Sequence, residues 1–135
     1  KLLKDDVQII MHSYSGGFKY LDPILEKGFY ISFSGSLTFN RSRNLKRIAA
    51  MVPLKRILCE TDSPFIPPET EPPIASSRPE HLAVVFNALK EAREEEEYIL
   101  KKALEDNISS LFDFERIDRN REKYIQLLEH ALWHR

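Results

Sequence analysis

Short apolar runs alternate with amphipathic stretches over the first 60 residues of the chain. The runs at residues 7–11, 29–33 and 57–59 have the composition of strands buried on both faces. Between them, apolar positions at helical spacing predict one helix that ends near Lys27 and another over residues 43–51. The order strand, helix, strand, helix, strand at these spacings predicts βαβ units and a parallel sheet.

The second half of the chain has a different pattern. Residues 64–79 are rich in proline and irregular, and a long connection of this kind next to a candidate site is expected to lie over that site. Helical spacing then resumes over residues 82–89, 100–112 and about 118–133. The fold class is therefore α/β, followed by C-terminal helices.

Each predicted strand ends in polar or glycine-rich residues. His12 follows the first strand, Ser34 and Gly35 follow the second, and Glu60 and Asp62 follow the third. Because the carboxyl ends of parallel strands share one edge of a sheet, where ligands bind, we expect these residues to lie together.

Glu60 and Asp62 are the candidate metal-binding acids. Strand residues alternate between faces, so the two carboxylates point to the same side. The strand must end by Ser63, because Pro64 has no N–H to donate to a ladder. Carboxylates at the end of a buried strand need a cation or hydrogen-bond donors, and a metal ion is a common partner. By residue type alone, a solvated strand end stays an alternative.

Composition narrows the possibilities only slightly. The 135 residues, 42% of them hydrophobic, suffice for one compact domain, and the net charge of −1 argues for neither nucleic acid nor membrane binding. Cys59 is the single cysteine, which excludes an intrachain disulfide, fits a reducing compartment and favours a role in core packing. With no apolar run long enough to cross a bilayer and no visible signal peptide, we expect no membrane association and a cytoplasmic or nuclear location inside the cell. Because a strand follows Lys1 almost at once, the sequence is expected to begin inside a domain.

The net charge conceals a local excess of basic residues. The stretch from Lys27 to Cys59 has no acidic residue. Its basic residues are Lys27, Arg41, Arg43, Lys46, Arg47, Lys55 and Arg56. Arg41 follows the loop of the second strand, where it is predicted to contact a phosphate backbone, and the turn at Ser34 and Gly35 can add N–H donors. Arg43 is expected on the same face as Arg41. We prefer the simpler interpretation of solvated side chains for four of the others, which are Lys46, Arg47, Lys55 and Arg56.

Three blocks of sequence carry a resemblance to a known family. They are His12-Ser13-Tyr14-Ser15-Gly16, the stretch 28–35 and the stretch 53–64, which contains Glu60-Thr61-Asp62-Ser63-Pro64. In this order and spacing they resemble the last three strand ends of the TatD family, metal-dependent deoxyribonucleases among the amidohydrolase-like TIM barrels. The resemblance covers about Val7 to Phe112, since residues 107–112 also resemble the closing N-x-x-x-L-F helix of that family.

The resemblance implies a fold and a function. Residues 1–114 would be the C-terminal part of a barrel, about its last three βα units, and residues 115–135 a helical extension. The activity implied is hydrolysis of DNA phosphodiester bonds with one or two divalent ions. Oxygen and imidazole ligands without thiolate suit Mg, Mn or Zn.

The resemblance also assigns roles to single residues. His12 and Asp62 would ligate metal, and Asp62 would also accept a proton from the attacking water. Glu60 would orient its neighbours instead of binding the ion. The residues expected to contact substrate are Ser15, Gly16, Ser34, Gly35 and Arg41.

Some features depart from the family pattern. The H-x-H pair, the Glu and the further His that the family places before His12 are not in this sequence, and Arg78-Pro79 stands where the family usually has Asn before Pro. Three βα units cannot close an eight-stranded barrel, so the missing strands are expected from the rest of a longer polypeptide or from elsewhere. A related barrel hydrolase acting on another ester or an amide, and a non-catalytic fragment with an incomplete site, stay as alternatives.

Overall fold

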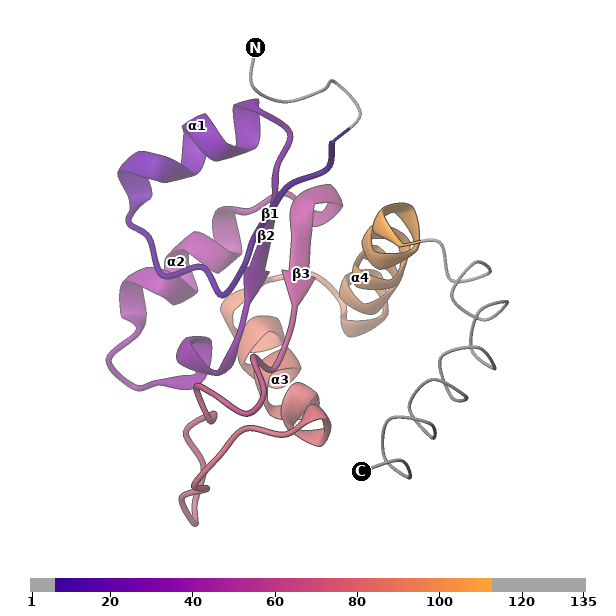
Figure 1. Cartoon of the computed structure of the whole chain (residues 1–135). Coiled ribbons are helices and arrows are strands. Elements are labelled where there is room, and N and C mark those ends of the chain that lie inside the picture. Colours follow the sequence, from indigo (N-terminus) through magenta and orange to yellow (C-terminus); the bar gives the residue numbers. More distant parts are fainter. Residues whose placement is uncertain (1–6, 113–135) are drawn as a thin grey trace, which may run out of the picture.

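The computed structural model describes residues 7–112 and contains a three-stranded sheet with helices on its flanks (Figure 1). The strands are β1 (Ile10–Met11), β2 (Tyr30–Phe33) and β3 (Ile57–Cys59). The α-helices are α1 (Leu21–Glu26), α2 (Arg43–Met51), α3 (Leu82–Ala92) and α4 (Glu97–Leu111). Short 3-10 turns are η1 (Phe18–Tyr20), η2 (Gly35–Thr38), η3 (Leu54–Arg56) and η4 (Pro79–His81).

The sheet is parallel, with β2 between β1 and β3. Ile10 is opposite Tyr30, and Phe33 is opposite Cys59. This register places the three strand ends at one edge, as the sequence pattern predicts. The strand β1 is shorter than the predicted run 7–11. The N–H of Tyr30, the first residue of β2, donates to the carbonyl oxygen of Ile9. Residues 7 and 8 therefore have no partner on β2.

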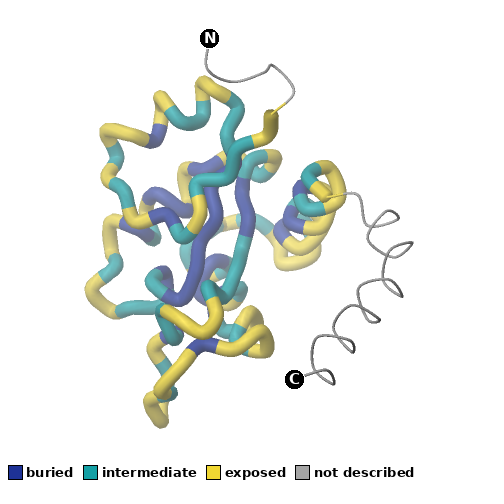
Figure 2. Tube along the Cα trace, viewed as in Figure 1, coloured by how far each residue is buried: buried dark blue, intermediate teal, exposed yellow. Residues whose placement is uncertain are grey.

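The core lies between the sheet and the helices that the βαβ pattern predicts. Ile31, Phe33 and Ile57 are fully buried on the side of the sheet that packs against Ile48 and Ala49 of α2. Figure 2 shows buried positions running along the strands and the inward sides of the helices. Cys59 packs against this cluster with a free thiol, in agreement with its predicted role.

Arg93 fixes the junction between α3 and α4. Its guanidinium is nearly fully buried and donates hydrogen bonds to the carbonyl oxygens of Ala49 and Val52, at the end of α2. It also pairs with Glu95, and this hydrogen bond lowers the pKa of the Glu95 carboxyl. The acidic run at residues 94–97 is thus a structured junction.

The proline-rich segment (residues 64–79) folds back onto the loop that follows β2. At its far end, the Ser77 N–H donates to Pro64 and the Ser77 hydroxyl donates to the carbonyl of Thr61. Near its start, the backbone of Ile66 and Pro68 closes so tightly over Gly35 that a side chain there would meet the carbonyl oxygen of Ile66. The segment is therefore held near its start as well as where Ser77 binds Pro64 and Thr61.

α4 is anchored to the sheet by one buried amide. Asn107 donates from Nδ2 to the carbonyl oxygens of Leu54 and Ile57, each at 2.8 Å, which ties the helix to the start of β3. The helical extension predicted for residues 115–135 lies outside the described residues, so the boundary at 114 stays a prediction. No helix within residues 7–112 has the length and apolar character needed to cross a membrane.

Gly35 provides a test of this packing. Replacing Gly35 with Ala is expected to lower the free energy of unfolding by about 1–3 kcal/mol, because the added methyl group overlaps the Ile66 backbone. Chemical denaturation measures the change. Gly17→Ala is the matched control, since nothing lies within 4 Å of the position of its added methyl group. Equal stability of the two variants would show that the segment does not close over Gly35.

Candidate active site

The imidazole of His12 lies between two carboxylates at the carboxyl edge of the sheet. Its Nδ1 is 2.7 Å from Oε2 of Glu60, and its Nε2 is 2.9 Å from Oδ1 of Asp62. His12 comes directly after β1, whereas both acids follow β3. The structure thus brings together three predicted site residues, which we call the strand-end cluster.

Glu60 connects the ends of the two outer strands. One carboxylate oxygen meets the His12 ring, and the other accepts a hydrogen bond of 2.7 Å from the backbone N–H of Ser13. The backbone N–H of Glu60 itself donates to Phe33, at the end of β2. Glu60 therefore fixes the orientation of the imidazole relative to all three strands.

The backbone is strained on both sides of the strand-end cluster. Ser13 has a φ of 44° and Asp62 a φ of 55°, both in the left-handed region. Such positions cost about 1–3 kcal/mol each and persist where surrounding contacts hold them. At Ser13 those contacts are its N–H bond to Glu60 and its hydroxyl, 2.6 Å from the hydroxyl of Ser34. The turns direct His12 and Asp62 toward each other.

The two carboxylates change the protonation of His12. Glu60 makes the largest contribution to raising the pKa of the imidazole above its ordinary value of 6.5, and Asp62 adds to it, while burial opposes the rise. When His12 is neutral and its proton is on Nδ1 facing Glu60, the lone pair of Nε2 faces a carboxylate oxygen of Asp62. A ring protonated only on Nδ1 therefore leaves room for a cation beside these two acceptors, whereas a ring protonated on both nitrogens donates to both carboxylates.

A divalent metal ion fits this pair of atoms. Two ligand atoms about 2.1 Å from one ion and at about a right angle are about 3.0 Å apart, close to the observed separation of 2.9 Å between Nε2 and Oδ1. Glu60 holds the other ring nitrogen, as carboxylates do behind metal-ligating histidines. Across residues 7–112, however, no three His, Cys, Asp or Glu side chains converge into a group able to hold a metal ion. His12 and Asp62 are thus part of a site at most.

Cys59 is excluded as a thiolate ligand near neutral pH. Burial raises the pKa of its thiol to about 12, and the neighbouring charge of Glu60 contributes in the same direction. The donors at this edge are therefore oxygen and nitrogen only.

The predicted substrate-contacting residues fall into three environments. Ser15 and Gly16 line a cavity of about 510 Å³ that also includes His12. Ser34 is fully buried and Gly35 lies under the backbone of Ile66, so here both support the loop after β2. Arg41 is exposed and its guanidinium carbon lies 5.4 Å from the centre of the Phe39 ring. Substrate contact by these five residues stays a prediction.

Two features of this edge were not found from the sequence. Ser13 contacts Glu60 through its backbone N–H and Ser34 through its hydroxyl. In the sequence, only its position directly after His12 points to such a role. Phe39 lies beside Arg41 and lines a cavity. The sequence feature that could have identified it is an aromatic residue within the basic stretch that has no acidic residue.

Comparison with known proteins identifies the family. The family model described as TatD related DNase matches residues 1–113. The chain belongs to this family. "Uncharacterized metal-dependent hydrolase YcfH" of Escherichia coli K12 is 35% identical over 123 residues, covering 87% of this chain and 43% of the relative. YjjV of the same organism, with the same description, is 31% identical over 107 residues, covering 77% of this chain and 40% of the relative.

The fold prediction is confirmed by a solved TatD-family structure. The crystal structure of YjjV, a TatD homologue from Escherichia coli K12, matches with a TM-score of 0.70 at 31% identity, covering 76% of this chain and 39% of that chain. The described residues therefore form part of a TatD-type TIM barrel. The chain spans about two fifths of the length of these relatives.

The contact between His12 and Glu60 predicts a pH dependence. In metal-free protein, NMR titration of the His12 ring should give a pKa above 6.5, and Glu60→Gln should lower it because the main cause of the shift is removed. Since the folded pKa is raised, the stabilisation from His12 is fully present below pH 6.5 and is lost as pH rises through the folded pKa. An unchanged pKa in Glu60→Gln would contradict the assignment.

Proposed function

We propose that the chain is the C-terminal part of a TatD-type metal-dependent hydrolase that cleaves phosphodiester bonds in DNA. The observation that carries the proposal is the His12 ring, with one nitrogen held by Glu60 and the other 2.9 Å from Asp62. The names of the relatives support a metal-dependent hydrolase, and the description of the family model supports DNA as the substrate.

In this proposal, the three residues of the strand-end cluster have separate roles. His12 would hold a divalent ion through Nε2, and Asp62 would hold it through a carboxylate oxygen. Glu60 accepts a hydrogen bond from the Nδ1–H group, and this tautomer leaves the lone pair of Nε2 available. A divalent ion held there would lower the pKa of a water, from about 15.7 toward 7, and offset charge on the phosphoryl oxygens. Asp62 would be placed to accept a proton from the attacking water.

The rest of the metal site is proposed to come from outside the residues described. His12 and Asp62 are too few to enclose an ion, and a TIM barrel has eight strands, of which residues 7–112 contain three. With imidazole and carboxylate donors and no thiolate, Mg, Mn and Zn suit the site, as one ion or two.

Replacing Asp62 is expected to nearly abolish catalysis without unfolding the protein. In the full-length polypeptide, Asp62→Asn should lower the rate of DNA hydrolysis by about 10²- to 10⁴-fold, because the amide neither carries the ligand charge nor accepts a proton. The assay is metal-dependent release of nucleotides from DNA, with Mg, Mn or Zn added after chelation.

The matched control for this variant is Asp106→Asn. Asp106 lies on α4 and pairs with Lys102. Wild-type turnover by Asp62→Asn would remove Asp62 from the mechanism. Metal-dependent activity on small esters or amides without activity on DNA would favour the related barrel hydrolase.

Arg41 is proposed to contact a phosphate of the DNA backbone. Arg41→Ala should weaken DNA binding and reduce its salt dependence by about one released counterion. Fluorescence anisotropy with labelled DNA, in the presence of a chelator to prevent cleavage, measures both. An unchanged salt slope would exclude the contact.

A further inference from the structure

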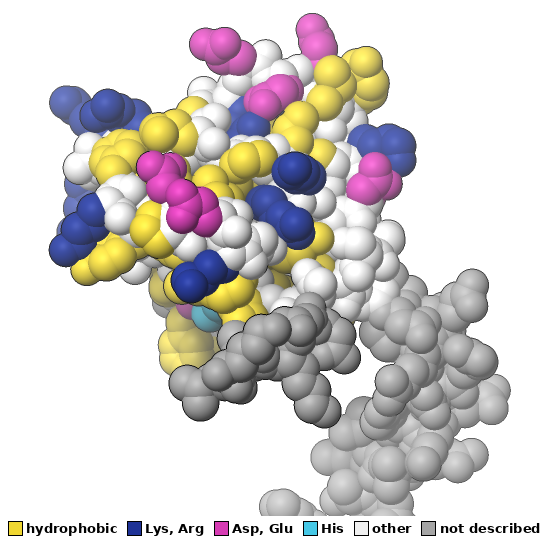
Figure 3. All heavy atoms as spheres, turned by 90° about the horizontal axis from the view of Figure 1, so that it is seen from above, with side chains coloured by type: hydrophobic (Ala, Val, Ile, Leu, Met, Phe, Trp, Pro, Cys, Tyr) yellow, Lys and Arg dark blue, Asp and Glu magenta, His cyan; other side chains and the backbone are white. Residues whose placement is uncertain are grey.

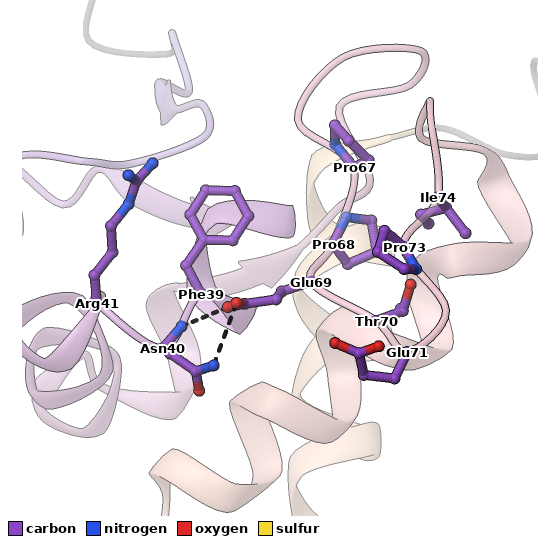
Figure 4. Close-up of a pocket in the computed structure, with 10 residues that line it drawn as sticks. All are labelled: Phe39, Asn40, Arg41, Pro67, Pro68, Glu69, Thr70, Glu71, Pro73 and Ile74. Atoms are coloured by element: carbon purple, nitrogen blue, oxygen red, sulfur yellow. Dashed lines mark hydrogen bonds between the residues drawn. The ribbon is translucent and has the colours of Figure 1, made fainter.

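A cavity of about 470 Å³ separates Phe39 and Arg41 from the proline-rich segment (Figure 4). Figure 4 shows the Phe39 ring projecting into the space between Arg41 and Pro67. Pro67, Pro68 and Pro73 form apolar parts of the opposite wall. The volume lies within the range of small-ligand sites, about 300–1,000 Å³.

The two walls of this cavity are held together by hydrogen bonds. The carboxylate of Glu69 accepts a bond of 2.6 Å from the backbone N–H of Asn40 and one of 3.2 Å from its side-chain amide. The backbone N–H of Glu69 donates to the hydroxyl of Thr38 at 2.7 Å. The cavity is thus formed before any ligand enters, which lowers the cost of ordering on binding.

The chemistry of the cavity is divided between its two sides. Arg41 lies over Phe39, and within residues 7–112 it has no carboxylate partner, so its N–H groups are available to an anion. On the opposite wall, Glu71 offers a carboxylate, whereas the carboxylate of Glu69 reaches across to Asn40. Between the two sides are the Phe39 ring and the prolines, which offer flat apolar contacts. An anion at one end, a flat aromatic body and amino donors at the other end describe a nucleotide.

The two walls of this cavity are formed by segments that leave the sheet at the same edge as the strand-end cluster. One wall follows Ser34 and Gly35 at the end of β2, and the other follows Asp62 at the end of β3. The walls meet where Ile66 closes over Gly35. A chain that enters this cavity therefore approaches the edge of the sheet that carries His12 and Asp62.

We propose that this cavity binds one unpaired nucleotide of a DNA strand, with its base stacked on Phe39 and against Pro67 and its phosphate at Arg41. The proposal rests on the DNA hydrolysis proposed above and extends it to a single-stranded segment next to the scissile bond. A base stacked within a duplex has no free face for the ring of Phe39, so the subsite requires an unpaired end or strand.

The test compares Phe39→Leu with the wild-type full-length protein under metal-free conditions. Anisotropy is measured with two labelled single-stranded oligonucleotides of equal length, one normal and one composed of abasic sites. Loss of the stacking ring should weaken binding of the normal strand by about 5- to 150-fold. It should leave binding of the abasic strand and the salt slope unchanged, since no phosphate contact is lost.

Tyr98→Leu is the matched control. Tyr98 is an exposed aromatic residue on α4 and does not line the cavity, so binding of both strands should be unchanged. Thermal unfolding checks that Phe39→Leu stays folded. Equal binding of the normal strand by Phe39→Leu and wild type, or equal loss for both strands, would overturn the subsite.

These outcomes are distinct from failure of the proposed function. If the wild-type protein does not hydrolyse DNA with any added metal but Phe39→Leu selectively loses the normal strand, the subsite stands and the hydrolase proposal fails. If DNA is hydrolysed and Phe39→Leu binds like wild type, the hydrolase stands and the subsite fails.

Discussion

The candidate site depends on one imidazole after β1, held on its two ring nitrogens by two carboxylates that both follow β3. His12 ends β1, and its carboxylate partners end β3, as far as 50 residues away in sequence. They meet because β2 lies between the outer strands in parallel register and aligns all three ends. With 60% of the His12 side chain exposed, solvent screens these ion pairs, and their main effect is orientation, with only a small gain in stability.

Two buried side chains away from the site stabilise this alignment of the strand ends. Arg93 joins the end of α2 to the junction before α4, and Asn107 ties α4 to the beginning of β3. Neither residue touches the strand-end cluster, yet both fix the helices that pack on the sheet. Precision at the polar edge thus comes from buried contacts elsewhere in the domain.

The sequence predicts those features that depend on local pattern. The limits of α2, the parallel order of the strands and the residues of the strand-end cluster all follow from spacing and from the resemblance in the three blocks. Features that arise only from tertiary contacts could not be predicted from the sequence. The turn at Ser13 depends on Glu60, and the position of the proline-rich segment depends on its approach to Gly35, so neither has a signal in its own neighbourhood. The role of Phe39 could not be predicted for the same reason, because its cavity forms only when Glu69 binds Asn40.

The attachment of the proline-rich segment has a consequence for how such a protein diversifies. Its base is pinned by Ser77 and its middle by Glu69, whereas the residues between these points, 71–76, are largely exposed. If this segment binds substrate as proposed, substitutions or length changes in that exposed stretch would alter substrate recognition while leaving the imidazole and carboxylates undisturbed. Selectivity and chemistry would then be encoded in separate stretches of one chain, so that the first could change without the second.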